Sequence, residues 1–301
     1  MNFKVKIGKA EFQNPVTVAS GTFACDETLY APEELKRFGA LVPKTVTLEP
    51  RTGNPPPRIA ETPSGMLNAI GIENAGIDSF LTDKLPGLQK TGVPLIISVT
   101  GNTTGEFIAL AGKLNGQKHV AALELNLSCP NLQKQVMIAQ DTRLTAETVA
   151  AVKKVSKVPV IAKLTPNVTS ITEIALAAEG AGADGLALIN TLAGMVIDTR
   201  SRRPVLGNLS GGLSGPAVRP VAVKMVYDVS RAVGIPVIGM GGILTANDAL
   251  EFLMAGATMI AVGSANFIDP DTPFQILDGI KDYMAENKVK DIQEIIGCAH
   301  V

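Results

Sequence analysis

Eight short apolar runs, rich in β-branched residues and bounded by Gly or Pro, recur along the chain. They span residues 15–21, 40–47, 94–101, 122–128, 158–164, 185–191, 235–242 and 259–265. Their hydrophobicity is nearly continuous, which is typical of parallel strands buried on both faces. Helical patterns lie between them, for example at 145–157 and 170–181. This alternation predicts the α/β class and a (β/α)8 TIM barrel.

The rest of the chain fits one barrel domain spanning residues 1–301. The sequence has no linker or low-complexity stretch, and α/β barrels of about 250 residues commonly form one domain. The opening "KVKIGKAEF" predicts a small N-terminal β-hairpin that closes the bottom of the barrel. Two long segments, 48–74 and 191–216, are expected to be loops that cover the C-terminal face.

Composition narrows the class of protein. The net charge is −1 and no Lys/Arg cluster is present, which argues against nucleic acid as a partner. No apolar run approaches the ~18 residues of a membrane helix, and the N-terminal segment does not resemble a signal peptide. Cys25, Cys129 and Cys298 lie far apart without a CxxC pair. We therefore expect no zinc, other metal or iron–sulfur cluster in this chain, and a cytoplasmic location.

One apparent nucleotide motif is misleading. Gly180, Gly182 and Gly185 match the dinucleotide-binding pattern G-x-G-x-x-G. A Rossmann loop follows a strand and opens a helix, whereas this segment ends a predicted helix and opens a predicted strand. A helix C-cap followed by a tight turn is the better interpretation, so we predict that NAD does not bind here.

Glycines gather at the C-terminal ends of the last two predicted strands, on the face where this fold places its active sites. These strands end in "GMGGI" and "VGSANF", which contain Gly241, Gly242, Gly263 and Ser264. Glycines there let backbone N–H groups approach an anion, although they could instead serve tight turns. The pattern at both ends favours a bound phosphate group.

Two lysines, Lys44 and Lys163, stand within otherwise apolar predicted strands. Burying an unpaired ammonium is costly, and no carboxylate lies near either lysine in sequence. The two lysines therefore indicate an anionic ligand. A side chain that reaches out of the barrel mouth and a Schiff-base amine stay open as alternatives.

Cys129 lies in "NLSCPN", at the end of a predicted strand. A free cysteine is more often a small buried apolar residue than a catalytic group. This one is flanked by Ser128 and two asparagines, as expected where a polar substrate binds. His119 and His300 lie away from the predicted site, so Cys129 is the best candidate for an acid–base group.

Several motifs occur together: "NLSCPN" (126–131), "PKTVTLEPRTGNPPPR" (43–58), "LNAIGIEN" (67–74), "INT" (189–191), "GGLSGPAVRPVA" (211–222) and "IGMGGI" (238–243). In this combination the chain resembles class 1 dihydroorotate dehydrogenases, the FMN barrels of pyrimidine biosynthesis, over residues 3–290. "GGLSGPA" and "IPVIGMGGI" are most similar to class 1B, the NAD-linked branch. In that branch the FMN subunit pairs with a second subunit that carries FAD and a [2Fe–2S] cluster.

The resemblance implies which residues bind each ligand. FMN would contact Ser20, Gly21, Lys44, Thr45, Ser98, Asn126, Lys163 and Ile189, with its phosphate on Gly215, Gly241, Gly242, Gly263 and Ser264. Dihydroorotate would contact Lys44, Asn68, Ala69, Ile70, Gly71, Ile72, Asn126, Asn190 and Thr191. Most class 1B chains have Asn in place of Ser98, and "LQKQVMIAQD" (132–141) replaces their usual Gly-rich segment.

The resemblance also implies the reaction. Cys129 would take the C5 proton of dihydroorotate while C6 gives hydride to the flavin, and Lys163 would stabilise the resulting negative charge. Because a thiol with an ordinary pKa of about 8.5 is a poor base at neutral pH, activity should rise toward alkaline pH. Electrons would pass through the partner's cofactors to NAD. The expected assembly is a homodimer that joins two partner subunits in a heterotetramer.

Three other functions stay open. A dihydropyrimidine dehydrogenase-like barrel shares the Asn-x-x-Cys-Pro motif and would act on uracil or thymine. A Schiff-base aldolase would use Lys163 together with the phosphate site. A barrel that only binds a phosphate ligand would have a structural cysteine.

Overall fold

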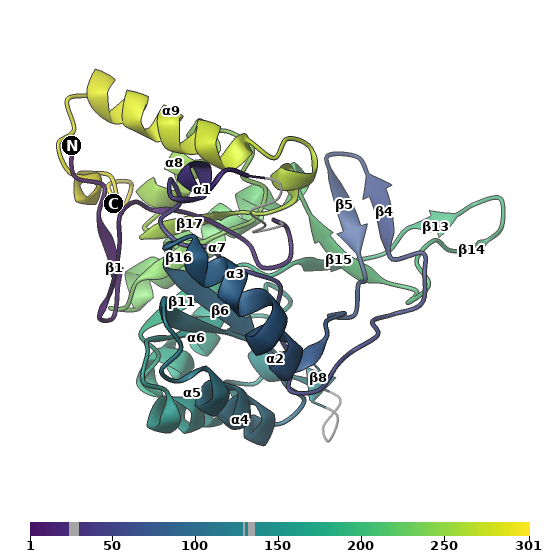
Figure 1. The fold of residues 1–301 in the computed structure, drawn as a ribbon. Helices are drawn as coiled ribbons and strands as arrows, with labels where there is room; N and C mark the ends of the chain where they lie inside the picture. The colour runs from purple at the N-terminus through teal and green to yellow at the C-terminus, as the bar shows by residue number, and fades with distance from the viewer. Residues whose placement is uncertain (24–29, 129, 132–135) are drawn as a thin grey trace.

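A parallel β-barrel forms the centre of the protein (Figure 1). The structure is a computed structural model that describes residues 1–23, 30–128, 130–131 and 136–301. Seven parallel strands run in the order β3-β17-β16-β11-β10-β7-β6. They are β3 (Val16–Val18), β6 (Leu95–Val99), β7 (Val120–Asn126), β10 (Val160–Lys163), β11 (Gly185–Leu188), β16 (Val237–Gly239) and β17 (Met259–Val262). Each overlaps one of the predicted runs.

The remaining predicted strand, residues 40–47, closes the sheet without being a regular strand. Isolated bridges join it to β6, pairing Leu41 with Leu95 and Val46 with Val99. Two hydrogen bonds join its start to β3, from Gly39 N to Val16 O at 2.9 Å and from Thr17 Oγ1 to Ala40 O at 2.7 Å. The continuous strand predicted here is wrong because Pro43, which has no N–H, interrupts the ladder between the bridges. The closed sheet is the TIM barrel that the sequence predicts.

Helices cover the outside of the barrel (Figure 1). They are α1 (Pro32–Leu35), α2 (Gly76–Ser79), the π-helical η1 (Phe80–Lys84), α3 (Leu85–Lys90), α4 (Thr104–Leu114), α5 (Thr142–Val155), α6 (Ile171–Gly180), α7 (Arg219–Ala232), α8 (Ala246–Met254) and α9 (Thr272–Glu286). The helices predicted at 145–157 and 170–181 correspond to α5 and α6. α5 buries Leu144, Val149 and Val152 on one face, as expected of a helix packed on a sheet.

A capping box at the start of α8 holds the loop that follows β16. Thr245 Oγ1 accepts a hydrogen bond from Asp248 N, while Asp248 Oδ2 accepts from Leu244 N and Thr245 N, both at 2.9 Å. Asp248 also pairs with Arg219 at the start of α7. A capping residue of this kind contributes on the order of 1 kcal/mol. The cap thus anchors the chain directly behind the glycines at 241–242.

The segment with the G-x-G-x-x-G pattern has the predicted context. α6 ends at Gly180 and β11 begins at Gly185. Gly182 between them has φ +90°, a conformation that favours glycine in a tight turn. The rejection of a Rossmann loop is therefore confirmed by the order of helix and strand.

The predicted N-terminal hairpin is confirmed and lies at the bottom of the barrel. β1 (Val5–Ile7) pairs antiparallel with β2 (Ala10–Phe12). A Cβ on Gly185, at the start of β11, would lie 2.8 Å from Ile7 Cγ2, so the fully buried Ile7 packs under this strand. The hairpin and the sheet that contains β4 and β5 lie at opposite ends of the barrel (Figure 1).

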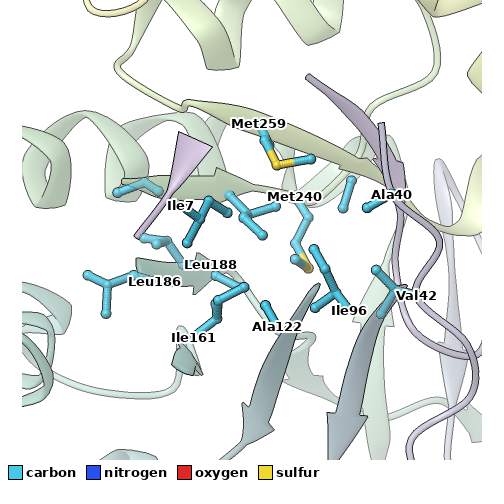
Figure 2. Close-up of a cluster of buried hydrophobic side chains, with 14 of the residues drawn as sticks. Ile7, Ala40, Val42, Ile96, Ala122, Ile161, Leu186, Leu188, Met240 and Met259 are labelled. Carbon is cyan, nitrogen blue, oxygen red and sulfur yellow. The ribbon is translucent and has the colours of Figure 1, made fainter. Parts of the chain in front are cut away.

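Apolar side chains from the strands fill the lower part of the barrel (Figure 2). Ile96, Ala122, Ile161 and Leu186 come from four different strands and are all fully buried. Deleting a buried side chain of this size costs about 2–5 kcal/mol, so this layer is a large part of the free energy of unfolding. The barrel is thus packed below, and polar groups are confined to its upper end.

The two long segments predicted as loops pair into a sheet, which corrects that prediction. This four-stranded antiparallel sheet runs in the order β12-β15-β5-β4. Its strands are β4 (Ile59–Thr62), β5 (Gly65–Asn68), β12 (Leu192–Gly194) and β15 (Gly211–Ser214). These strands are short and contain glycines, so the sequence shows no recognisable strand pattern for them. A small apolar cluster of Ala60, Leu67, Ala69 and Leu206 supports the sheet.

Shorter elements complete the described structure. The small hairpins are β8 (Pro130–Asn131) with β9 (Val136–Met137) and β13 (Ile197–Asp198) with β14 (Arg203–Pro204). The 3-10 helices are η2 (Ile138–Gln140), η3 (Pro216–Val218), η4 (Ser264–Phe267) and η5 (Ile292–Glu294). Within the described part of the chain, no helix has both the length and the apolar character needed to span a bilayer.

Candidate active site

A cavity of about 880 Å³ opens between the C-terminal ends of the barrel strands and the antiparallel sheet. It is lined by most of the residues that the sequence assigned to a site: Ser20, Gly21, Lys44, Thr45, Asn68, Ala69, Ile70, Gly71, Ile72, Asn126, Lys163, Ile189, Asn190, Thr191, Gly215, Gly241, Gly242, Gly263 and Ser264. These residues come from many separate segments, and the fold brings them together in one place.

Two residues assigned to the site, Cys129 and Ser98, are not among the described residues that line the cavity. Cys129 lies outside the described residues, so its catalytic role stays a prediction, although the preceding Ser128 lines the cavity. Ser98 is fully buried and lies behind the cavity wall. Its hydroxyl is 2.9 Å from Thr45 Oγ1, which in turn donates to Ser20 Oγ at 3.2 Å. Through this chain Ser98 supports two residues of the wall.

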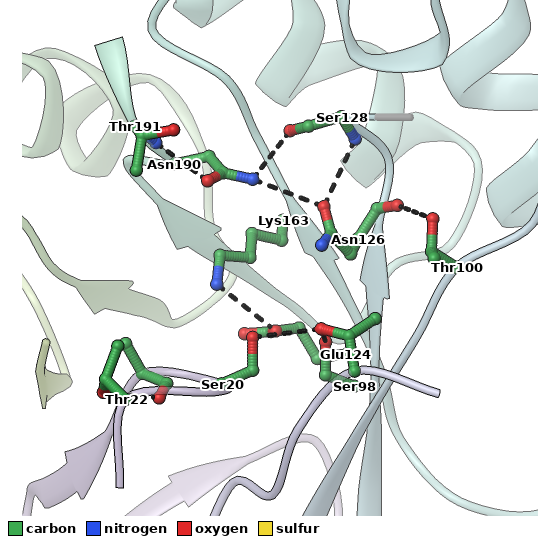
Figure 3. Close-up of polar contacts among 12 residues, drawn as sticks. Ser20, Thr22, Ser98, Thr100, Glu124, Asn126, Ser128, Lys163, Asn190 and Thr191 are labelled. Atoms are coloured by element: carbon green, nitrogen blue, oxygen red, sulfur yellow. Dashed lines mark hydrogen bonds and ion pairs between the residues drawn. The ribbon is translucent and has the colours of Figure 1, made fainter. Parts of the chain in front are cut away.

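Amide side chains at the ends of β7 and β11 form a hydrogen-bonded cluster (Figure 3). Asn190 Nδ2 donates to Ser128 Oγ at 2.9 Å and to Asn126 Oδ1 at 3.3 Å. Thr191 N donates to Asn190 Oδ1 at 2.8 Å, and Thr100 Oγ1 donates to Asn126 O at 2.8 Å. These bonds fix the orientation of both amides before any ligand arrives. The cluster suits a planar ligand with several N–H and C=O groups.

A buried ion pair lies at the floor of the cavity (Figure 3). Lys163 on β10 and Glu124 on β7 are 5% and 2% exposed, and Lys163 Nζ is 3.5 Å from Glu124 Oε1. Glu124 was not predicted as the partner of Lys163, because the two residues are 39 positions apart in the sequence. The available signal was an acidic residue inside the apolar run "AALEL", where a charge needs a partner.

Lys44 projects into the cavity from the segment that closes the barrel. It is exposed to this open space, yet protein atoms crowd it, since a Cβ on Gly21 would lie 3.1 Å from Lys44 Nζ. Burial by the surrounding wall, followed by repulsion from Lys163, lowers the pKa of Lys44, while Glu73 opposes the shift. Two neighbouring cations in one cavity favour an anionic ligand, which would relieve their repulsion.

Glycines form the side of the cavity near α7 and α8. Gly215, Gly241 and Gly242 have φ values of +102°, +130° and +78°, which L side chains rarely adopt. A Cβ on Gly242 would lie only 2.7 Å from Gly215 O. Gly263 differs, because its φ is −109° and the nearest atom to an added Cβ is Ala19 Cβ at 3.8 Å. The protein itself thus leaves space beside Gly263 inside the cavity.

The cavity is also lined by residues that the sequence analysis did not assign, among them Thr22, Glu73, Ser128, Met137, Thr165, Asn167, Asn208, Ser210, Met240 and Phe267. Asn167 has a bracing role, donating to Thr165 Oγ1 at 2.8 Å and to Thr191 O at 3.0 Å. Its position just after the strand "VIAKL" was a usable signal. The sequence carries no comparable signal for Asn208 and Ser210, because only the pairing of β15 with β5 brings them over the cavity.

Comparison with known proteins points to one family. The family model described as dihydroorotate dehydrogenase matches residues 2–284. The catalytic subunit of dihydroorotate dehydrogenase B (NAD(+)) from Desulforamulus reducens is 51% identical over 302 residues, which cover 100% of this chain and 99% of that protein. Proteins of the same name from Desulforudis audaxviator and Geotalea daltonii are 52% and 48% identical, over 98% and 100% of this chain and 97% and 99% of their own lengths.

The glycine side of the cavity gives a prediction about stability. We expect Gly242→Ala to destabilise the protein by about 1–3 kcal/mol, because the new Cβ would meet the backbone of Gly215 at a positive φ. Gly263→Ala is the matched control, with a smaller loss, because its Cβ would enter open space. Urea unfolding of both variants measures the difference. Equal losses would contradict the assignment of the Gly242 constraint to the backbone.

Proposed function

The chain belongs to the dihydroorotate dehydrogenase family, and from this premise we propose that it oxidises (S)-dihydroorotate to orotate in pyrimidine biosynthesis. The observation that carries the proposal is the convergence of Lys44, Lys163 and the Asn126–Asn190 amides on one cavity. The product is a planar ring with an imide and a carboxylate. The amides suit the imide, and a lysine suits the carboxylate.

The residues present fit FMN as the bound cofactor. A Cβ added to Gly263 would meet no protein atom closer than 3.8 Å, so the fold itself does not require glycine at this position. The neighbouring glycines line the cavity with backbone atoms. We propose that Gly215, Gly241, Gly242, Gly263 and Ser264 hold the phosphate, and that Ser20, Gly21, Thr45 and Ile189 contact the rest of FMN. When bound, the flavin accepts the hydride from the substrate. Ser98 then acts indirectly, by orienting Thr45.

We propose that the substrate binds in the same cavity, next to FMN, with Lys44 contacting both ligands. Lys44 would hold the carboxylate, and the 68–72 segment would contribute backbone and side-chain contacts. Asn74, directly after this segment, accepts hydrogen bonds from Thr47 N at 3.2 Å and Gly76 N at 2.9 Å. It therefore keeps the segment close to residues 40–47, which contain Lys44.

The proton at C5 needs a base, and we propose Cys129 for it. Ser128 and Asn126 bring the chain to the edge of the cavity immediately before this residue. The cysteine thiolate would take the proton as the C–H bond at C6 gives up its hydride. A thiol is mostly protonated at neutral pH, so the proposed base works better as the pH rises.

The relatives' names describe a catalytic subunit linked to NAD(+). We propose that this chain likewise dimerises and works in the cytoplasm in a heterotetramer with a subunit carrying FAD and [2Fe–2S]. In support, the one dinucleotide-like glycine pattern joins a helix to a strand.

An absorbance spectrum tests the central proposal. We expect the purified protein to be yellow, with flavin absorption bands that bleach when dihydroorotate is added without oxygen. A dihydropyrimidine dehydrogenase-like enzyme would instead bleach with dihydrouracil. A colourless protein that borohydride traps as a substrate adduct would point to the aldolase alternative, and a colourless protein without an adduct would leave a binding protein.

Cys129→Ala should keep FMN bound but reduce the rate of flavin reduction by about 10²–10⁴-fold, the usual contribution of a placed base. Cys129→Ser should regain some activity only at high pH, since a hydroxyl is harder to deprotonate than a thiol. Stopped-flow absorbance across pH values measures both variants. Near-normal reduction by the alanine variant would remove Cys129 from the mechanism.

Lys44→Ala should weaken orotate binding more than FMN binding, because the flavin has many other contacts. In the wild type, affinity for the carboxylate should fall as pH rises through the pKa of Lys44, when the ammonium loses its charge. Because burial lowers this pKa, the fall should begin below the ordinary lysine value. Titrations followed by the flavin spectrum measure the affinity. Lys44→Arg is the control, and unchanged orotate affinity in Lys44→Ala would exclude this role.

The isolated chain should be reduced by dihydroorotate yet form NADH slowly or not at all. Adding a subunit with FAD and an iron–sulfur cluster should restore NADH formation, because electrons then have a route to the nucleotide. Steady-state absorbance of NADH, with a check for a co-purifying partner, provides the measurement. Efficient NADH formation by this chain alone would refute the two-subunit proposal.

A further inference from the structure

Glu124 is a buried carboxylate whose role the proposed reaction does not explain. Among the described residues, Glu124 and Asp248 are the carboxylates that are at least nine-tenths buried. Asp248 is accounted for by the capping box of α8 and its pairing with Arg219. Glu124 instead sits near the middle of β7, on a barrel strand whose apolar residues are otherwise packed in the core.

The register of the strands places Glu124 one layer below the cavity. It pairs with Ser98 of β6 and with Ile161 of β10, while Asn126, two residues further along β7, pairs with Lys163. Asn126 and Lys163 line the cavity. Figure 3 shows the Lys163 side chain directed toward Glu124. Because Glu124 is buried and does not line the cavity, its carboxylate contacts Lys163 from inside the protein.

The geometry of the pair differs from a closed salt bridge. The Lys163–Glu124 distance is 3.5 Å, whereas Lys153 and Asp184 on the outside of the barrel are 2.6 Å apart. Lys163 is therefore held near Glu124 without a short hydrogen bond, which leaves its N–H donors able to meet a second acceptor above. A buried pair of this kind adds little net stability, because the desolvation of both charges offsets their attraction.

We propose that Glu124 is a positioning residue for the flavin reaction: it holds the Lys163 ammonium at the cavity floor and sets the positive charge that the bound flavin meets. The proposal deepens the proposed function and rests on it. With Glu124 ionised, the pair is close to neutral as a whole. A flavin that gains negative charge on reduction is then stabilised by Lys163 only in part.

Removing the charge of Glu124 should make the site more electropositive. Glu124→Gln keeps the size and one hydrogen-bond acceptor but leaves the Lys163 charge uncompensated. A unit charge a few ångströms away acts strongly even at a high effective dielectric constant, so reduced flavin should be favoured by about tenfold or more. For a two-electron couple, a tenfold change in the equilibrium is about 30 mV.

The test compares FMN-loaded wild type with Glu124→Gln, using the two-electron midpoint potential and the affinity for sulfite, which binds oxidised flavins as an anion. We expect a higher potential and about tenfold tighter sulfite binding in the variant, with the opposite shifts in Lys163→Gln. Ile161→Val is the matched control, because Ile161 is the uncharged buried neighbour of Glu124 on β10 and is assigned to no ligand. It should change neither quantity appreciably.

A purely structural role for Glu124 would lower thermal stability and leave the potential and sulfite affinity unchanged, which overturns the proposal. If Glu124→Gln fails to fold, Glu124→Asp serves instead, since a shorter carboxylate lies further from Lys163 and should give a smaller rise in potential. An unchanged potential in that variant would count equally against the role. Absence of flavin from the wild type would overturn the proposed function and this inference together, whereas flavin with an unshifted potential removes only the inference.

Discussion

Closure of the parallel sheet through residues 39–46 is the constraint on which the site depends. Hydrogen bonds to β3 on one side and to β6 on the other leave no open edge between the first and third barrel strands. Closing the sheet also brings Thr45 between Ser20 and Ser98, so that one hydroxyl chain crosses three neighbouring strand ends. Without closure, Ser20 and Lys44 would not share a cavity with Asn126.

Pro43 interrupts the strand pairing of the closing segment, directly before Lys44. A regular strand would alternate its side chains and pair every second N–H, but the proline interrupts that pattern between two bridges. The chain beyond it presents Lys44 to the cavity and buries Thr45 against Ser98. The break in the strand at Pro43 is thus followed directly by Lys44, which places a cation at the cavity wall.

Charge in the cavity is balanced by groups placed at different depths. Lys163 is compensated from beneath by Glu124, whereas Lys44 is desolvated and repelled by Lys163, so its pKa falls. One cation is therefore nearly neutralised within the protein, and the other is left to an incoming anion. This difference is consistent with assigning Lys163 to FMN alone and Lys44 to both FMN and the anionic substrate.

Much of the architecture could be predicted from the sequence because it rests on short-range signals. The apolar runs located the strands, the patterns at 145–157 and 170–181 located two helices, and "KVKIGKAEF" predicted the hairpin. Of the proposed site residues, Lys44, Lys163, Cys129 and the glycines of "GMGGI" and "VGSANF" could be selected from the sequence alone, because a parallel barrel gathers its strand ends at one face. Motif resemblance supplied the rest of that set.

Tertiary structure decided what depends on register between distant segments. Glu124 became the partner of Lys163 only when β7 aligned with β10, and Ser98 moved behind the wall because β6 pairs beside β7. The sheet over the cavity formed from strands of three or four residues on segments more than a hundred residues apart. Such pairings have no local signature, since their stability comes from hydrogen bonds and burial that exist only after the barrel has closed.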